Sequence, residues 1–284
     1  MERVGAGVKK GGGGGGGAGG GFGGSAGGVR GETFYSILEK IRSRVGGVRG
    51  IFFWVGWGMV LAGWVQGEDS FPAGMTILET SKSGEMKIVV GEQAQLDTAR
   101  EPASTFKVVI AWAALDRGLV QDVATPLEGA EGLGLRESLQ KSINPPFALL
   151  AEKLGGDVLG EYARKSGLIA GKIDGGWMKG GGKEAVHGGD LKTTIRREHA
   201  VAVGWMRGEA PWGGEAGKKL QEALVWPGEK ILLRAKTGSY GGCLWMTGYG
   251  PEKAVTVFLE GPVSRRPEIL KAFFGRWGVA PTRP

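Results

Sequence analysis

Strand-like segments stand at both ends of the part of this sequence that can fold, with a long helical stretch between them. The strand segments are short apolar runs with alternating or β-branched residues. They cover residues 75–80, 86–90, 231–237, 243–249 and 254–260. Helical patterns cover residues 106–115, 146–154, 197–206 and 266–277. This order predicts an α+β fold, in which one antiparallel five-stranded sheet is flanked by helices and joined to an all-helical lobe. We expect any functional site to lie in the cleft between the sheet-containing lobe and the all-helical lobe.

The first 50 residues differ from the rest in composition. They hold 20 of the 57 glycines, including the run from Gly11 to Gly17, and such a stretch buries too little apolar surface to order itself. We therefore expect residues 1–50 to be a disordered, basic extension. They carry 8 Lys/Arg and 3 Asp/Glu, so +5 of the net charge of +7 lies there and +2 (28 minus 26) remains elsewhere. The high pI thus gives no argument for a nucleic-acid surface.

An apolar segment follows this extension. Three arginines precede an uncharged apolar run from Ile51 to Val65, and small residues near a cut site come next. This pattern predicts a signal peptide at 51–67 and an exported, periplasmic domain at 68–284. An uncleaved membrane anchor is the alternative, because residues 50–67 are just long enough to span a bilayer. The position of the segment also suggests that translation starts near Val45 or Val48.

The words P-A-S-T-F-K, from Pro102 to Lys107, carry the first chemical signal. Ser104 and Lys107 lie three residues apart, which places them on one face of a helix with the amine able to reach the hydroxyl. A serine hydroxyl is a weak nucleophile until such a base takes its proton. Pro102 suits a first helical turn, whose free N–H groups can hold an oxyanion. An isolated S-x-x-K is more often a solvated helix face.

Two further elements follow in order and strengthen this signal. Ser142-Ile143-Asn144 lies downstream, and Lys236-Thr237-Gly238 ends a strand-like run. The ordered set S-x-x-K, S-x-N and K-T-G resembles that of serine β-lactamases and penicillin-binding proteins. The surrounding words P-A-S-T-F-K, L-R-E-S-L-Q-K-S-I-N-P-P-F and K-T-G-S-Y-G are similar to those of class D β-lactamases. The resemblance covers roughly residues 74–278.

The resemblance implies a role for each of these residues. Ser104 would be the nucleophile and Lys107 its base, kept partly neutral by burial near Phe106 and Trp112. Ser142 would relay a proton to the leaving group, and Asn144 would donate to the substrate amide, although an asparagine before two prolines also suits a helix N-cap.

The K-T-G strand would hold the other end of the substrate. Lys236 and Thr237 would bind the carboxylate shared by penicillins and peptidoglycan stem peptides. Gly238 would let the ligand lie against the strand, and the N–H of Ser239 would be an oxyanion donor beside that of Ser104. A K-T-G tripeptide that merely ends a hairpin strand is the structural alternative.

Two departures from the class D pattern bear on deacylation. Class D enzymes have a hydrophobic residue where Asn144 stands, beside a lysine that carbon dioxide carboxylates, and a tryptophan where this chain has Val186 and His187. Trp177 lies nearby at a different offset, within a glycine-rich loop. Carbamylation of Lys107 is thus a possible modification rather than a firm expectation, and no other cofactor is expected.

These observations leave three functions open. The first is a class D type β-lactamase, which hydrolyses β-lactams through an acyl-serine. The second is a D,D-transpeptidase or carboxypeptidase acting on stem peptides, and the third is a sensor that binds β-lactams without hydrolysis. The expected partners are β-lactams or stem peptides, without nucleic acid, and a membrane only if residues 50–67 stay uncleaved. The single Cys243 excludes an internal disulfide, and His187 and His199 form no metal-ligand pattern.

Overall fold

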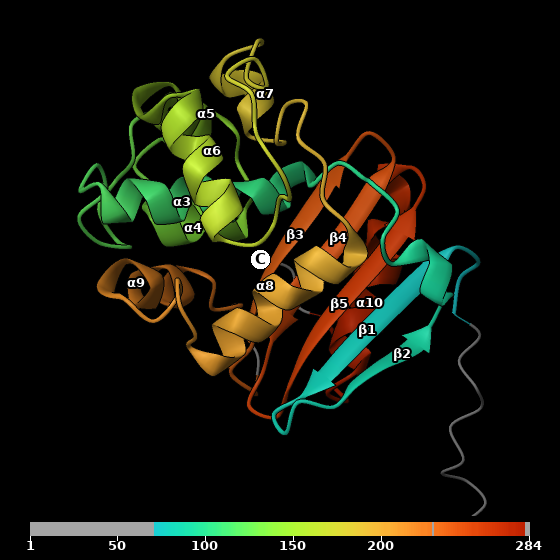
Figure 1. The fold of residues 1–284 in the computed structure, drawn as a ribbon. Coiled ribbons are helices and arrows are strands. Elements are labelled where there is room, and N and C mark those ends of the chain that lie inside the picture. Colours follow the sequence, from blue (N-terminus) through green and yellow to red (C-terminus); the bar gives the residue numbers. More distant parts are fainter. Residues whose placement is uncertain (1–70, 229, 282–284) are drawn as a thin grey trace, which may run out of the picture. The chain divides into compact units, whose positions relative to one another are not determined.

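The computed structural model describes residues 71–281 except residue 229. Within this part the chain forms a five-stranded antiparallel sheet in the order β2-β1-β5-β4-β3 (Figure 1). The strands are β1 (Met75–Ser81), β2 (Met86–Val90), β3 (Arg234–Tyr240), β4 (Cys243–Tyr249) and β5 (Lys253–Glu260). The two early strands join the sheet beside the last one, so the predicted α+β architecture is confirmed.

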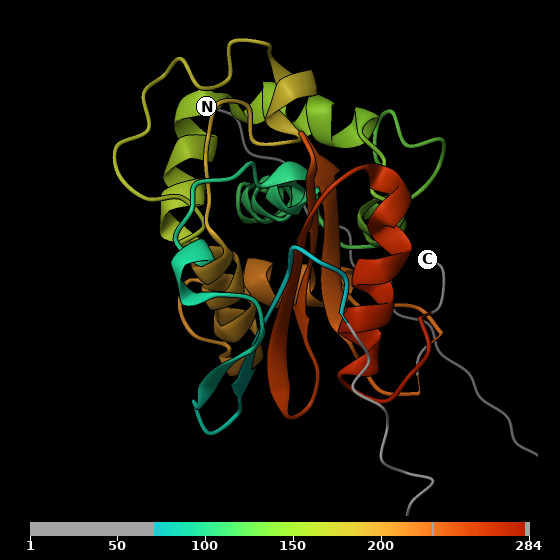
Figure 2. The same ribbon diagram turned by 90° about the vertical axis from the view of Figure 1, so that its right-hand side faces the viewer.

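Helices cover both faces of the sheet. α8 (Ile195–Arg207) lies across one face and α10 (Arg266–Gly275) across the other, as the two views together show (Figures 1 and 2). Successive strand residues point to opposite faces. Trp245 therefore packs in a cluster with Ile195 of α8, whereas its neighbour Met246 packs with Phe273 of α10. Because both faces are covered, β4 is buried along its whole length.

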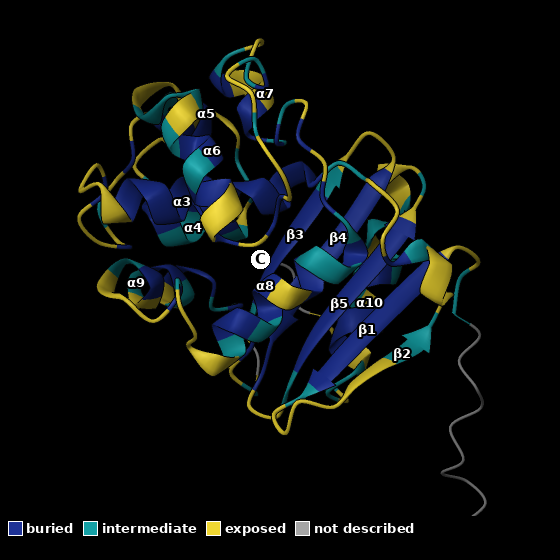
Figure 3. Ribbon diagram, viewed as in Figure 1, coloured by how far each residue is buried: buried dark blue, intermediate teal, exposed yellow. Residues whose placement is uncertain are grey.

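The remaining helices form a lobe around one central helix, α3. The lobe consists of the central helix α3 (Lys107–Asp116) and of α4 (Leu135–Gln140), α5 (Pro145–Leu154), α6 (Gly156–Lys165), α7 (Gly182–Ala185) and α9 (Glu215–Ala223). Short 3₁₀ helices are η2 (Gln93–Gln95), η3 (Ala103–Phe106) and η4 (Val263–Arg265). α3 is buried from Lys107 to Leu115, as its dark colour shows (Figure 3). A helix that is apolar on every side needs neighbours on every side, and α5, α6 and α9 supply them.

Three sequence expectations need correction or refinement. The third strand begins at Arg234 and runs to Tyr240, because the preceding residues loop back so that Val225 can pair with Arg234. The expected helix at 106–115 is preceded by the separate turn η3, so Ser104 lies in a 3₁₀ helix before α3. His199, for which the sequence shows only the absence of a metal-ligand pattern, is buried in packing and bonds to hydroxyls, with Nε2 2.7 Å from Thr80 Oγ1.

The predictions for residues 1–50 and 51–67 fall outside the described residues. None of the helices in the described part of the chain combines the length and apolar character needed to cross a bilayer.

Candidate active site

The S-x-x-K segment and the K-T-G strand lie against each other. η3 packs on β3, and the approach is so close that a Cβ at Gly238 would lie 3.2 Å from the carbonyl oxygen of Pro102. Glycine at this position is therefore explained by the turn that carries Ser104. Ala103 has φ +53°, a strained value for a residue with a side chain. Ser104 itself is 7% exposed and lies in η3, which leads directly into the buried helix α3.

The amine of Lys107 is buried and forms hydrogen bonds with the S-x-N segment. Its Nζ donates to the carbonyl oxygen of Ser142 at 2.6 Å and to Oδ1 of Asn144 at 2.5 Å. Burial lowers the pKa of Lys107 from 10.5 to about 7. The aromatic neighbour of this amine is Phe147, whose ring centroid is 5.6 Å from Nζ. Trp112, which the sequence analysis placed near this amine, packs its ring against Tyr162 and Trp212.

Ser142 lies between two lysines. Its Oγ accepts a hydrogen bond from Nζ of Lys236 at 2.9 Å and lies 3.4 Å from Nζ of Lys107. Its φ of +55° is again strained for a residue with a side chain, and the strained backbone aims the carbonyl oxygen at Lys107. One hydroxyl is thus in reach of both amines, which is the geometry that a proton relay needs.

Asn144 stands at the N-cap position of α5, yet its side chain makes no capping hydrogen bond. Its Oδ1 accepts from Lys107 instead, and the side chain is exposed. The capping alternative is therefore wrong for the side chain, and the NH₂ group of Asn144 is left to donate elsewhere.

Lys236 is buried more deeply than the sequence suggests. It is 1% exposed, and its Nζ donates to Ser142 Oγ and to the carbonyl oxygen of Thr237 at 2.7 Å. Burial, followed by the charges of Lys107 and Arg266, lowers the pKa of Lys236 well below 10.5.

Arg266 is a candidate binding residue that the sequence analysis missed. Its Nη2 donates to Thr237 Oγ1 at 3.0 Å, so a guanidinium stands beside the K-T-G threonine. Arg266 is the first residue of α10, and the packing of α10 against the sheet brings its guanidinium to Thr237 of β3. The available signal was its position in the last helix, which by itself does not distinguish it from other surface arginines.

The far side of the site is closed by the loop after α7. The ring of His187 stacks on that of Tyr240, with centroids 4.3 Å apart and planes 4° apart. Burial, and then the charge of Lys107, lowers the pKa of His187 below 6.5. Ser239, whose N–H was expected to face the oxyanion, lies between Gly238 and Tyr240 on β3.

The surroundings of Lys107 do not fit a carbamate. The two short hydrogen bonds of its Nζ go to the Ser142 carbonyl and to Asn144 Oδ1, which carbamate oxygens would meet oxygen to oxygen, and its third partner is Ser142 Oγ at 3.4 Å. The indole N–H of Trp177 donates to the carbonyl oxygen of Gly156 at 3.0 Å and so is already used. The group that fits this site is the free amine.

A serine in the turn before a buried helix, an amine one turn later whose pKa is lowered to about 7 and a guanidinium beside the K-T-G strand form an arrangement that suits an acyl ester on the serine. Comparisons with known proteins bear on this arrangement. Residues 74–173 match the family model of the penicillin binding protein transpeptidase domain, a stretch that includes Ser104, Lys107, Ser142 and Asn144. No curated protein matches the sequence.

Solved structures of class D β-lactamases have a fold similar to that of this chain. The class D β-lactamase from Fusobacterium nucleatum subsp. polymorphum is 18% identical, with a TM-score of 0.60 over 72% of this chain and 92% of that one. The class D β-lactamase from Nostoc is 17% identical, with a TM-score of 0.60 over 72% and 94%. That from Bacillus subtilis is 15% identical, with a TM-score of 0.59 over 73% and 93%. The predicted resemblance to the β-lactamase and penicillin-binding transpeptidase family is confirmed.

Proposed function

We propose that this chain is a serine β-lactamase that opens β-lactams through an acyl ester on Ser104. The observation that carries the proposal is the buried amine of Lys107, which has a pKa of about 7 and lies one helical turn after Ser104. An amine with this pKa is substantially unprotonated at neutral pH and can take a proton from a hydroxyl.

In the acylation step Lys107 accepts the proton of Ser104 while Oγ attacks the carbonyl carbon of the lactam. The carbon–nitrogen bond of the ring then breaks, and Ser142 passes a proton to the departing nitrogen. Ser142 suits this task because its Oγ is within reach of both Lys107 and Lys236. The N–H groups of Ser104 and Ser239 would hold the oxyanion, and Asn144 would donate its NH₂ to the substrate amide.

The substrate carboxylate would bind at the K-T-G strand. Thr237 supplies a hydroxyl, and Arg266 beside it supplies a planar cation suited to a carboxylate. Lys236 acts here through its hydrogen bond to Ser142 Oγ, because its buried amine has a pKa lowered well below 10.5. In deacylation, water attacks the ester with the free amine of Lys107 as base, and Ser104 regains its proton.

A D,D-peptidase is the second candidate, and Asn144 favours it. The side-chain amide binds Lys107 directly, and a polar residue at this position is the version found in penicillin-binding proteins. The substrates would then be stem peptides that end in D-Ala-D-Ala. Either substrate class fits the proposal that the domain is exported to the periplasm.

One experiment separates these functions. The purified full-length chain is mixed with a chromogenic cephalosporin, a penicillin and a pentapeptide ending in D-Ala-D-Ala, and turnover and protein mass are followed together. Catalytic turnover of the β-lactams supports the β-lactamase. A stable adduct on Ser104 with release of D-alanine from the peptide supports the D,D-peptidase. An adduct with neither reaction supports a non-hydrolytic binding protein, and no adduct contradicts all three.

We predict that β-lactam turnover does not depend on carbon dioxide. Because acceptor oxygens surround the Lys107 amine, added bicarbonate is expected to change the rate by less than about twofold, and ¹³C-labelled carbon dioxide should give no carbamate signal. A rate that rises with bicarbonate, together with a carbamate signal that a Lys107→Met variant loses, would contradict the free-amine mechanism.

Replacing Arg266 with leucine is expected to weaken substrate binding more than the chemical step. Loss of a charge-assisted hydrogen bond costs about 1.5–3 kcal/mol, so KM should rise by roughly 10- to 100-fold with kcat changed far less. Steady-state kinetics with a penicillin would measure this. Arg265→Leu is the matched control, since Arg265 pairs with Glu268 away from Thr237. An unchanged KM would remove Arg266 from the carboxylate site.

A further inference from the structure

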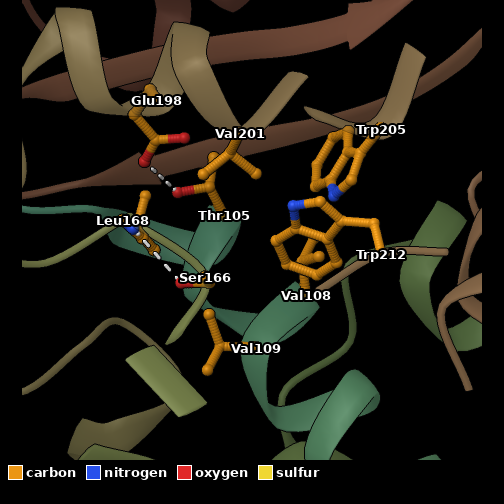
Figure 4. A pocket seen from close by; sticks show the side chains of 9 residues that line it. All are labelled: Thr105, Val108, Val109, Ser166, Leu168, Glu198, Val201, Trp205 and Trp212. Atoms are coloured by element: carbon orange, nitrogen blue, oxygen red, sulfur yellow. Dashed lines mark hydrogen bonds between the residues drawn. The ribbon is translucent and has the colours of Figure 1, made fainter. Parts of the chain in front are cut away.

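Thr105, the residue after the nucleophile, has one hydroxyl between two oxygen atoms. Its Oγ1 lies 2.5 Å from the carbonyl oxygen of Pro102 and 2.6 Å from Oε1 of Glu198 (Figure 4). A hydroxyl has one proton to donate. If Glu198 were a carboxylate, both neighbours would be acceptors and one of these short contacts would lack a proton. A carboxylic acid at Glu198 satisfies both, because it donates to Thr105 and Thr105 donates to Pro102.

The surroundings of Glu198 favour the acid. The residue lies on α8, is 1% exposed and lines a small cavity whose other walls are mainly apolar (Figure 4). Those walls are formed by Val108, Val109, Leu168, Val201, Trp205, Trp212 and the hydroxyl residues Thr105 and Ser166. Burial raises the pKa of Glu198 from 4.5 to about 8, and the hydrogen bond from Thr105 lowers it only in part.

No cation pairs with this carboxyl group among the described residues. The ring of His199, the next residue on α8, bonds to Thr80 and Thr256 of the sheet. Lys107, on the neighbouring α3, directs its amine to Ser142 and Asn144. A buried carboxyl group without a cation is held as the neutral acid, because ionisation would leave a charge unpaired in an apolar pocket.

We propose that Glu198 is a positioning residue, a carboxylic acid that donates its proton to Thr105 Oγ1 and thereby fixes the turn that carries Ser104. The turn is short and closed on itself, since Thr105 N–H also donates to the Pro102 carbonyl at 3.3 Å. Its Ala103 is strained, and such a conformation persists only where neighbours hold it.

The turn also sets the distance between the nucleophile and the K-T-G strand. A Cβ at Gly238 would lie 3.2 Å from Thr105 N and 3.2 Å from Pro102 O, so η3 and β3 touch at the atoms that Glu198 anchors through Thr105. When Glu198 ionises, the Thr105 hydroxyl must turn towards the carboxylate, and Pro102 loses its hydroxyl partner. The position of Ser104 relative to the N–H of Ser239 would then change.

The kinetic test rests on the proposed function and compares Glu198→Gln with Glu198→Ala in the full-length chain. The amide of glutamine keeps a donor for Thr105 at every pH, whereas alanine removes it. The rate of Ser104 acylation by a chromogenic cephalosporin is measured from about pH 6 to about 9.5. Glu215→Gln is the control, since Glu215 is an exposed residue of α9.

The wild-type rate is expected to rise through the Lys107 pKa of about 7 and to fall above the Glu198 pKa of about 8. At pH 9 roughly a tenth of Glu198 stays protonated, so the wild-type rate should fall about tenfold further than that of Glu198→Gln. Titration of Lys236 affects both proteins and cancels in the comparison. Glu198→Ala should be slower than Glu198→Gln by about tenfold at pH 7.

Two outcomes would overturn the role of Glu198. One is an identical alkaline limb in the wild type and Glu198→Gln. The other is an infrared spectrum of ¹³C-glutamate-labelled protein at pH 7 that lacks a carboxylic-acid band which Glu198→Gln removes. The infrared test needs no activity, so it judges the protonation of Glu198 even if the wild type is not acylated, a result that would contradict only the proposed function.

Discussion

Replacing Ser104 with alanine is expected to abolish the covalent adduct with β-lactams and to lower turnover by roughly a thousandfold or more. Ser104 lies in η3, just before α3, and its neighbour Thr105 cannot readily replace it because the Thr105 hydroxyl is held between Pro102 and Glu198. Lys107 cannot substitute because its amine is bonded to Ser142 and Asn144. Intact-protein mass after mixing with a penicillin measures the adduct, and a chromogenic cephalosporin measures turnover.

The control for this change is Ser138→Ala. Ser138 is a fully buried serine of α4 whose Oγ has no hydrogen-bond partner, so its loss should leave the adduct and the rate within about twofold. An adduct of equal yield in Ser104→Ala, in a variant that unfolds at the wild-type temperature, would move the nucleophile to another residue.

Replacing Lys107 with methionine is expected to slow acylation by roughly 100- to 10,000-fold, because the general base is lost. The increase of the acylation rate through the Lys107 pKa of about 7 should disappear as well. Rapid mixing with a chromogenic cephalosporin over a range of pH measures both effects. A variant that keeps the wild-type rate and pH profile would show that another group takes the proton of Ser104.

The same substitution should stabilise the protein. The pKa of Lys107 falls from 10.5 to about 7 on folding, so between these values the unfolded chain binds a proton that the folded chain does not. Lowering the pH through this window therefore destabilises the wild type by about 1.4 kcal/mol for each pH unit. Lys107→Met removes this cost, and its advantage in urea unfolding should be larger at pH 7 than near pH 9.5.

Lys218→Met is the matched control for the stability measurement. Lys218 is an exposed residue of α9, and its replacement should shift stability by less than about 0.5 kcal/mol at either pH. A Lys107→Met variant that is less stable than the wild type at pH 7 would mean that the amine is ionised and well solvated in the folded protein.

The sequence predicts the fold well where periodicity is strong. β2 and β4 have the expected limits, and β1 and β5 differ by one residue. The four expected helices correspond closely to α3, α5, α8 and α10, whereas α4, α6, α7 and α9 were not expected individually. It failed at the start of β3, since Ile231 and Leu232 are apolar enough for a strand but lie in a loop that lets Val225 pair with Arg234. Local apolar runs do not reveal which residues the neighbouring chain segment pairs with.

The residues of the candidate site also fall into two groups, those predicted from the sequence and those that only the structure reveals. Ser104, Lys107, Ser142 and Lys236 were predicted as site residues from the sequence. In the structure Ser142 bonds to both lysines, and η3, which carries Ser104, packs on β3. Arg266 and Glu198 were not found, because each reaches the site from a helix that no local motif connects to it. Asn144 was recognised, but only the structure shows that its oxygen faces Lys107 instead of capping α5.

The place of β3 in the sheet has a consequence for what the protein can accept. β3 is the outermost strand, and from Lys236 to Tyr240 it pairs with β4 on one side while no described strand covers the other. An unpaired strand edge of this kind can hydrogen-bond to the main chain of an extended ligand. A peptide tail offers this edge alternating carbonyl and N–H groups, and a β-lactam offers such groups through its acylamino side chain and ring carbonyl, since the ring nitrogen has no hydrogen. Recognition by main-chain hydrogen bonds would therefore admit both peptides and β-lactams. Discrimination between them would depend on how the ligand carboxylate is bound and on how fast the acyl-serine ester is hydrolysed.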